Sequence, residues 1–92
     1  MVLPILHKCV RAFFGIVVAM YYDDHPPPHF HVRYGEYRAI LEIETAAVLF
    51  GNLPHRGLGM VVEWTASHRA ELEENWGRAR ARVPLMPIRP LE

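Results

Sequence analysis

The chain has 92 residues, 51% of them hydrophobic and 22% charged, a composition that excludes an intrinsically disordered protein. Ten basic and ten acidic side chains cancel, which argues against nucleic acid as the main partner but leaves room for a local basic patch. One cysteine, Cys9, cannot form an internal disulfide, and no apolar run approaches the roughly 18 residues of a membrane span. We therefore expect a single cytoplasmic domain over residues 1–92, without a membrane segment.

Strand patterns fill the first half of the chain, after residues 1–12, which we leave unassigned. The run IVVAMYY, residues 16–22, is rich in β-branched and aromatic residues and predicts a strand that is covered on both faces. HFHVRY (29–34) and YRAILEIE (37–44) predict the two strands of a hairpin, and AVLF (47–50) predicts a short fourth strand.

The hairpin has a defined register, because Gly35-Glu36 forms a two-residue loop and glycine at its first position is typical of a type II′ turn. Facing residues then have numbers that sum to 71. One face carries apolar pairs and is expected to receive a helix. The other face is expected to pair His29 with Glu42, His31 with Ile40, and Arg33 with Arg38.

The second half predicts one long helix. Pro54 stands where a first-turn proline would, and the helix is expected to end before Pro84. Gly57 and Gly59 weaken its first turn, which is expected to fray or to pack closely on the sheet. The predicted fold is therefore α+β: an antiparallel meander of three to four strands packed by the helix, followed by an extended Pro-rich tail over 83–92. The expected packing stripe is Leu58, Val61, Val62, Thr65, Leu72, Trp76 and Ala79.

The segment DDHPPPHFH, residues 23–31, is the main candidate site. Two histidines at i and i+2 on a strand can share one metal ion, for which zinc or manganese would be suitable. Histidine also suits general acid–base catalysis near neutral pH. The alternative is a stiff polyproline turn, in which one X-Pro bond could be cis, with His29 hydrogen-bonded to Glu42. The catalytic candidates are His25, His29, His31 and Glu42, and the metal-ligand candidates are Asp24, His29, His31 and Glu42, with Asp23 or His25 as further members.

Arginines and tryptophans supply the remaining candidates. Arg33 and Arg38 face each other and should repel, so they are candidates for binding an anion. Arg78, Arg80 and Arg82 lie at the C-terminal end of the helix, where their positive charges stabilise the negative end of the helix dipole. A contact with a nucleic acid is the minor alternative.

Trp76 is expected in the core. Trp64 falls at the edge of the stripe, where an exposed indole would mark a partner surface, although burial in the core is the favoured alternative. The partner-surface candidates are Trp64, Arg78 and Arg82.

Two motifs, D-H-x-P-P-H-x-H at residues 24–31 and E-W-x-x-x-H-R-x-E-L-x-x-N-W at 63–76, resemble the bacterial domain of unknown function 4160 family. The resemblance runs from about Phe13 to Leu91. It implies a small protein encoded beside another short gene product, in an arrangement like a toxin–antitoxin pair, and hence a heteromeric partner. It implies no catalytic role for any residue.

Two functions from different classes follow. The first, which we favour, is an interaction module that binds a small protein encoded nearby. The second is a nuclease-type toxin, in which His25, His29 and His31 act as acid–base or metal-ligand groups and the arginine pair holds a phosphate. A metal-binding protein without catalysis would differ from the second only in turnover.

Overall fold

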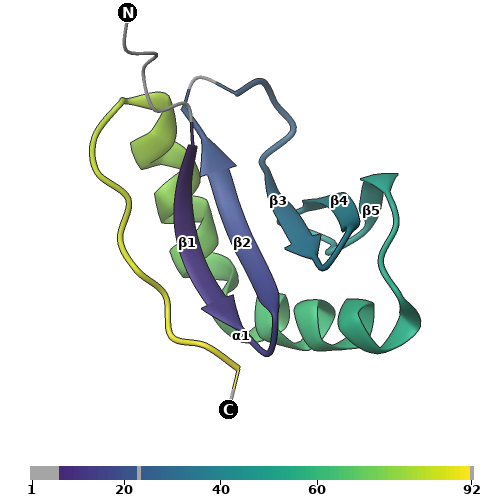
Figure 1. Cartoon of the computed structure of the whole chain (residues 1–92). Helices are drawn as coiled ribbons and strands as arrows, with labels where there is room; N and C mark the ends of the chain where they lie inside the picture. The colour runs from purple at the N-terminus through teal and green to yellow at the C-terminus, as the bar shows by residue number, and fades with distance from the viewer. Residues whose placement is uncertain (1–6, 23, 92) are drawn as a thin grey trace, which may run out of the picture.

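A five-stranded antiparallel sheet packs against one long helix (Figure 1). This computed structural model describes the backbone of residues 7–22 and 24–91, and the side chains of 12–22 and 24–91. The strands lie in the order in which they occur in the chain, so the sheet is a simple meander. The α+β class is confirmed, with one strand more than expected. The elements are β1 His7–Phe13, β2 Ile16–Tyr21, β3 His29–Tyr34, β4 Tyr37–Glu42, β5 Val48–Gly51 and α1 His55–Arg80.

The hairpin of β3 and β4 has the predicted register, with His29 opposite Glu42 and Arg33 opposite Arg38. Gly35 has a φ of +60°, and Glu36 is not among the residues with positive φ, as a type II′ turn requires. Phe30, Val32, Ala39 and Leu41 are buried on the face that meets the helix, as expected, whereas Tyr37 at the hairpin end is exposed.

The first two strands depart from the expectation in two ways. β1 occupies the second half of the segment that we left unassigned, and it turns into β2 through Phe14 and Gly15, both at positive φ. β2 is internal in the sheet, but only one of its faces is buried. Its burial alternates along the strand, with Ile16, Val18 and Met20 in the core. The predicted covering of both faces is therefore wrong, since the helix lies on one side of the sheet only.

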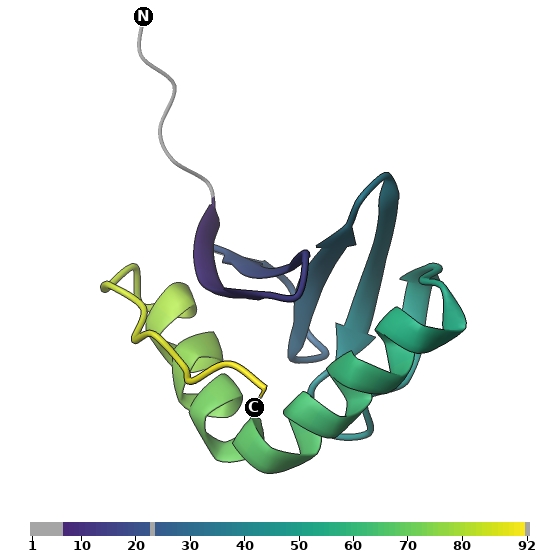
Figure 2. The ribbon, with the colours of Figure 1, turned by 60° about the horizontal axis from the view of Figure 1, so that its bottom comes forward.

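The helix α1 is bent, and Figure 2 shows it as two arms that wrap around one side of the sheet. The bend lies at His68, whose φ of −128° is not helical. Two hydroxyls just before it donate to carbonyls one turn back, Thr65 to Val61 at 2.7 Å and Ser67 to Glu63 at 3.4 Å. Such bonds bend helices because they draw the carbonyl away from its i+4 amide.

The buried stripe of α1 differs from the predicted one. Trp64 is fully buried (0% exposed) against Phe13, whereas Val62 is 41% exposed and Trp76 is only half-buried. Burial of Trp64 was one of the two alternatives, and its use as an exposed partner surface is wrong. Pro54 lies at the N-cap position, one residue before the first helical residue. The buried helix residues are Gly57, Val61, Trp64, Thr65, Leu72, Asn75 and Ala79.

The Pro-rich tail has no regular structure and lies along the helix, as the yellow segment of Figures 1 and 2 shows. Asn75 exchanges two hydrogen bonds of 2.8 Å with the backbone of Met86. The indole of Trp64 donates to the Arg89 carbonyl at 2.7 Å, and Ile88 is 1% exposed. The tail therefore completes the core.

Among the described residues, no helix is long and apolar enough to cross a membrane.

Candidate metal centre

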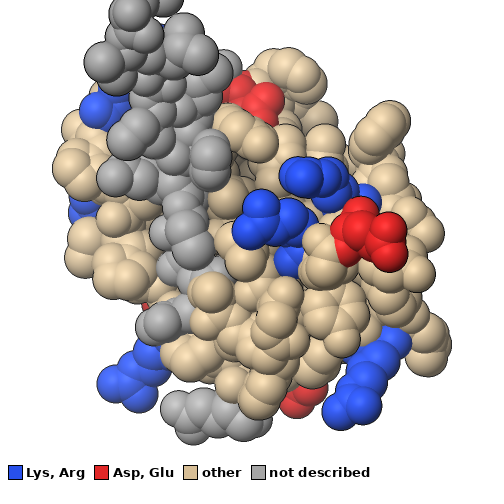
Figure 3. All heavy atoms as spheres, viewed as in Figure 1, with Lys and Arg blue, Asp and Glu red and all other residues tan. Residues whose placement is uncertain are grey.

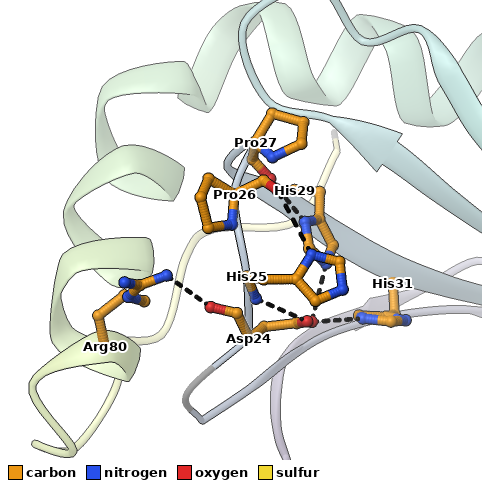
Figure 4. Close-up of polar contacts among 7 residues, drawn as sticks. All are labelled: Asp24, His25, Pro26, Pro27, His29, His31 and Arg80. Atoms are coloured by element: carbon orange, nitrogen blue, oxygen red, sulfur yellow. Dashed lines mark hydrogen bonds and ion pairs between the residues drawn. The ribbon is translucent and has the colours of Figure 1, made fainter.

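Asp24, His29 and His31 come together where the Pro-rich loop enters β3 (Figure 4). The period of two along a strand places both histidines on one side of β3. Asp24 lies at the far end of the three prolines, where the chain bends at Pro26 and Pro27 and the bond between these two residues is cis. One ligand atom from each of the three side chains lies within 4.8 Å of the other two.

The carboxylate of Asp24 is the centre of this cluster. Its Oδ2 lies 2.8 Å from Nε2 of His29 and 3.1 Å from Nε2 of His31, and its Oδ1 accepts a hydrogen bond of 3.0 Å from the His25 amide. Partial burial raises the pKa of Asp24, but the hydrogen bonds from His31, His29 and the His25 amide, with the charge of His29, outweigh it. The pKa therefore lies below its usual value, and the site holds a carboxylate.

The ring of His29 is 5% exposed and lies between two hydrogen-bond acceptors. Its Nδ1 is 2.7 Å from the Pro27 carbonyl, which can only accept, so Nδ1 carries a proton. Its Nε2 faces the Asp24 carboxylate, which is also an acceptor. A neutral imidazole has a single N–H and satisfies only one of these contacts. The second contact therefore requires either an imidazolium or a cation between Nε2 and the carboxylate.

The end of helix α1 supports the cluster from outside, a role that no pattern in the sequence indicated. Arg80 donates to the Asp24 carbonyl at 2.7 Å and lies over the ring of Trp76 at 5.9 Å. That ring in turn packs against His29, with centroids 5.0 Å apart. On the other side, the rings of Tyr21 and His31 are nearly perpendicular, with centroids 4.2 Å apart. The half-buried Trp76 thus packs against the core, as expected, and also lines the site.

Other predicted members lie apart from the cluster. Glu42 faces His29 in the register, yet its carboxylate accepts from Thr45 at 2.6 Å, so the predicted bond between His29 and Glu42 is wrong. His25 is exposed and its ring lies 6.0 Å from that of His29, outside the group of three. Asp23 lies outside the described residues.

The remaining arginine candidates divide between two places. Arg33 and Arg38 face each other on β3 and β4, on the sheet face away from the helix. Arg78 bonds to Glu74 at 3.1 Å and reaches the Pro84 carbonyl at 3.4 Å, while Arg82 follows the helix at a φ of +58°. The proposed roles of Arg78 and Arg82 in contacting a partner stay predictions.

A family model, described as a domain of unknown function (DUF4160), matches residues 15–77. The chain belongs to the DUF4160 family. The matched segment includes all three residues of the cluster and ends before Arg80. No curated protein and no solved structure matches the chain. The DUF4160 match thus shows the family alone.

Proposed function

We propose that Asp24, His29 and His31 bind one divalent cation, zinc or manganese. The observation that supports this most strongly is the double contact of His29, because both ring nitrogens face acceptors. A cation on Nε2 satisfies the ring and the carboxylate together. The bond from Nδ1 to the Pro27 carbonyl then has the role of an outer-shell contact, which fixes the tautomer and the ring orientation of a ligating histidine.

The geometry is close to what an ion needs. Metal–ligand bonds of about 2.0–2.1 Å in a tetrahedral site separate neighbouring ligand atoms by about 3.4 Å. Oδ2 of Asp24 lies 2.8 and 3.1 Å from the two Nε2 atoms. The contacts would therefore open by only about 0.3–0.6 Å on binding. Two imidazoles and one carboxylate suit zinc and also manganese, and three protein ligands leave a position for water or substrate.

Calorimetric titration with zinc sulfate and manganese chloride tests this proposal. The wild type should bind one ion per chain, and His31→Ala should lose the binding because two ligands no longer define a site. His55→Ala is the matched control, since His55 is an exposed histidine on the helix, far along the chain from the cluster. Absence of saturable binding by the folded wild type, or unchanged binding by His31→Ala, would refute the metal site. The nuclease hypothesis stays a prediction, and the same variants serve for its assay on RNA.

A second candidate is the binding of a small partner protein at the free edge of β5. Among the described residues β5 pairs only with β4, so its outer edge presents unpaired backbone groups. Its side chains Val48, Leu49 and Phe50 are all exposed. An extended strand of the partner can pair with such an edge, as in β-strand addition. This edge now supports the interaction-module hypothesis better than Trp64 or the tail, which are used inside the domain.

Co-expression with the product of the neighbouring gene, followed by size-exclusion chromatography, tests the second candidate. Leu49→Lys should abolish co-elution, because an edge lysine blocks strand addition. Val62→Lys, at an exposed apolar residue of the helix, should leave it intact. Separate elution of the two wild-type proteins would count against a partner at this edge, and so would co-elution that survives Leu49→Lys. The toxin–antitoxin assignment stays a prediction.

A further inference from the structure

The sheet face opposite the helix holds a groove of about 360 Å³, lined from β2, β3, β4 and β5. This volume lies at the lower end of the range for small-ligand sites, about 300–1,000 Å³. Its floor is apolar, with Val17, Ala19 and Ile40. Figure 3 shows basic side chains gathered over β3 and β4, and the arginines of these two strands are Arg33 and Arg38.

The two arginines are directly opposed across the hairpin. Among the described residues, neither side chain makes a hydrogen bond or an ion pair. Side chains in this position start about 4.5–5.5 Å apart, and like charges so placed are destabilising. A bound anion removes that repulsion. Guanidinium groups bind phosphate with two parallel hydrogen bonds each, so the pair offers a phosphate several strong donors at once.

Aromatic rings border the same groove. Phe50 on β5 is 72% exposed, the most exposed of the large apolar side chains described, although it lines the groove. Tyr21 lines the opposite side, on β2. A planar base can stack on such a ring, a contact worth about 1–3 kcal/mol per base in proteins that bind single strands. The groove thus combines phosphate donors, an apolar floor and the exposed ring of Phe50.

We propose that this groove binds a nucleotide, with its phosphate between Arg33 and Arg38 and its base against Phe50. The nucleotide can be free or part of a single strand, because the chemistry of recognition is the same. His31 belongs both to the groove lining and to the Asp24 cluster, and it precedes Arg33 by two residues on β3, about 7 Å along the strand. The phosphate site and the cation site are therefore neighbours, but nucleotide binding does not require the cation.

Titration followed by NMR tests the inference, with EDTA present so that the metal proposal is judged separately. The probes are AMP, UMP, inorganic phosphate and a hexameric single-stranded RNA. AMP should shift the signals of residues 17–21, 31–40 and 50 saturably, and Arg33→Gln and Arg38→Gln should each weaken binding about ten-fold or more. Arg56→Gln, an exposed arginine outside the groove, is the matched control and should not change the affinity.

Phe50→Ala separates a nucleotide from a simple anion. The substitution should weaken the binding of AMP about ten-fold and leave the binding of inorganic phosphate unchanged, since only the base stacks on the ring. Tighter binding of the RNA than of AMP would assign the groove to single strands, and equal binding would assign it to free nucleotides. The inference is overturned if the wild type binds none of the nucleotide probes, if the arginine variants bind as tightly as the wild type, or if Phe50→Ala leaves AMP binding unchanged.

Discussion

The two faces of the sheet are built from the same strands and differ in what their side chains do. On the face toward α1, Phe30, Val32 and Leu41 are at most 2% exposed and form the core with Trp64. On the other face, the alternate residues of the same strands include His31 and the arginine pair, which lie in an open groove. The strand period of two thus separates stability from chemistry within a single hairpin. Substitutions on the two faces should therefore have different consequences.

The largest effect is expected in the core, at Trp64. Trp64→Ala should lower the free energy of unfolding by about 3–5 kcal/mol, because it leaves a cavity between the helix and the sheet and removes the bond to the tail. Val62→Ala, two residues away on the exposed side, should change it by less than about 1 kcal/mol. Urea denaturation of both variants measures the difference. Equal losses would contradict the described orientation of the helix.

The second-largest loss of stability is expected at Asn75, because its side chain joins the tail to the helix. Asn75→Ala leaves the amide and carbonyl of Met86 without their partners and should cost about 1–3 kcal/mol. Hydrogen exchange at the Met86 amide should quicken in step with the loss of stability. Glu73→Ala, at an exposed helix residue, is the control. An unchanged exchange rate in Asn75→Ala would show that the tail is held by other contacts.

Substitution of two helix glycines by alanine sharpens the comparison, because the change in stability should have opposite signs at the two positions. A Cβ on Gly57 would lie 2.8 Å from Cδ2 of Tyr34, whereas one on Gly59 would meet nothing within 4 Å. Gly59→Ala should stabilise the protein by about 0.5–1 kcal/mol through helix propensity. Gly57→Ala should destabilise it by about 1 kcal/mol, because the Tyr34 ring must shift. Thermal unfolding of both variants checks the signs, and stabilisation by Gly57→Ala would contradict close packing of the first turn.

The smallest effect is expected at Asp24 in the absence of metal. Its pKa is lowered by folding, so its ionised form adds stability above its unfolded value of 3.8, and this contribution is lost as the pH falls through the folded value. The free energy of unfolding of the wild type should exceed that of Asp24→Asn by less than about 1 kcal/mol near pH 6, and this difference should shrink below pH 4. Urea denaturation over this range, with EDTA present, measures it. A difference that grows on acidification would have the wrong sign.

The fold could be predicted where one local signal was decisive. Gly35 fixed the loop, and from the loop every pair of the hairpin followed. The helix stripe could not be predicted in full, because apolar side chains fall on more than one side of the helix and spacing alone does not decide whether Val62 or Trp64 faces the sheet. The bend at His68 had no signal in the sequence either. The strand β1 was missed because its segment shows no alternation strong enough to separate it from a loop.

The candidate site was predicted in part for similar reasons. His29 and His31 had to share a face because they are two residues apart on a strand, and Asp24 was among several possible third members. Register placed Glu42 opposite His29, but register fixes only the backbone, and the Glu42 side chain bonds to Thr45 instead. Arg80 lies 56 residues from Asp24 in the chain, a contact that only the folded helix creates.

The most direct test of the cation site is the protonation of the His29 ring, read by long-range ¹⁵N–¹H NMR during a zinc titration. We expect His29 to keep its proton on Nδ1, bonded to the Pro27 carbonyl, and its Nε2 signal to move to the position of a metal-bound nitrogen at one zinc per chain. His31 should shift with it. A His29 ring that still carries both protons at saturating zinc would show an ion pair with Asp24 and no metal centre.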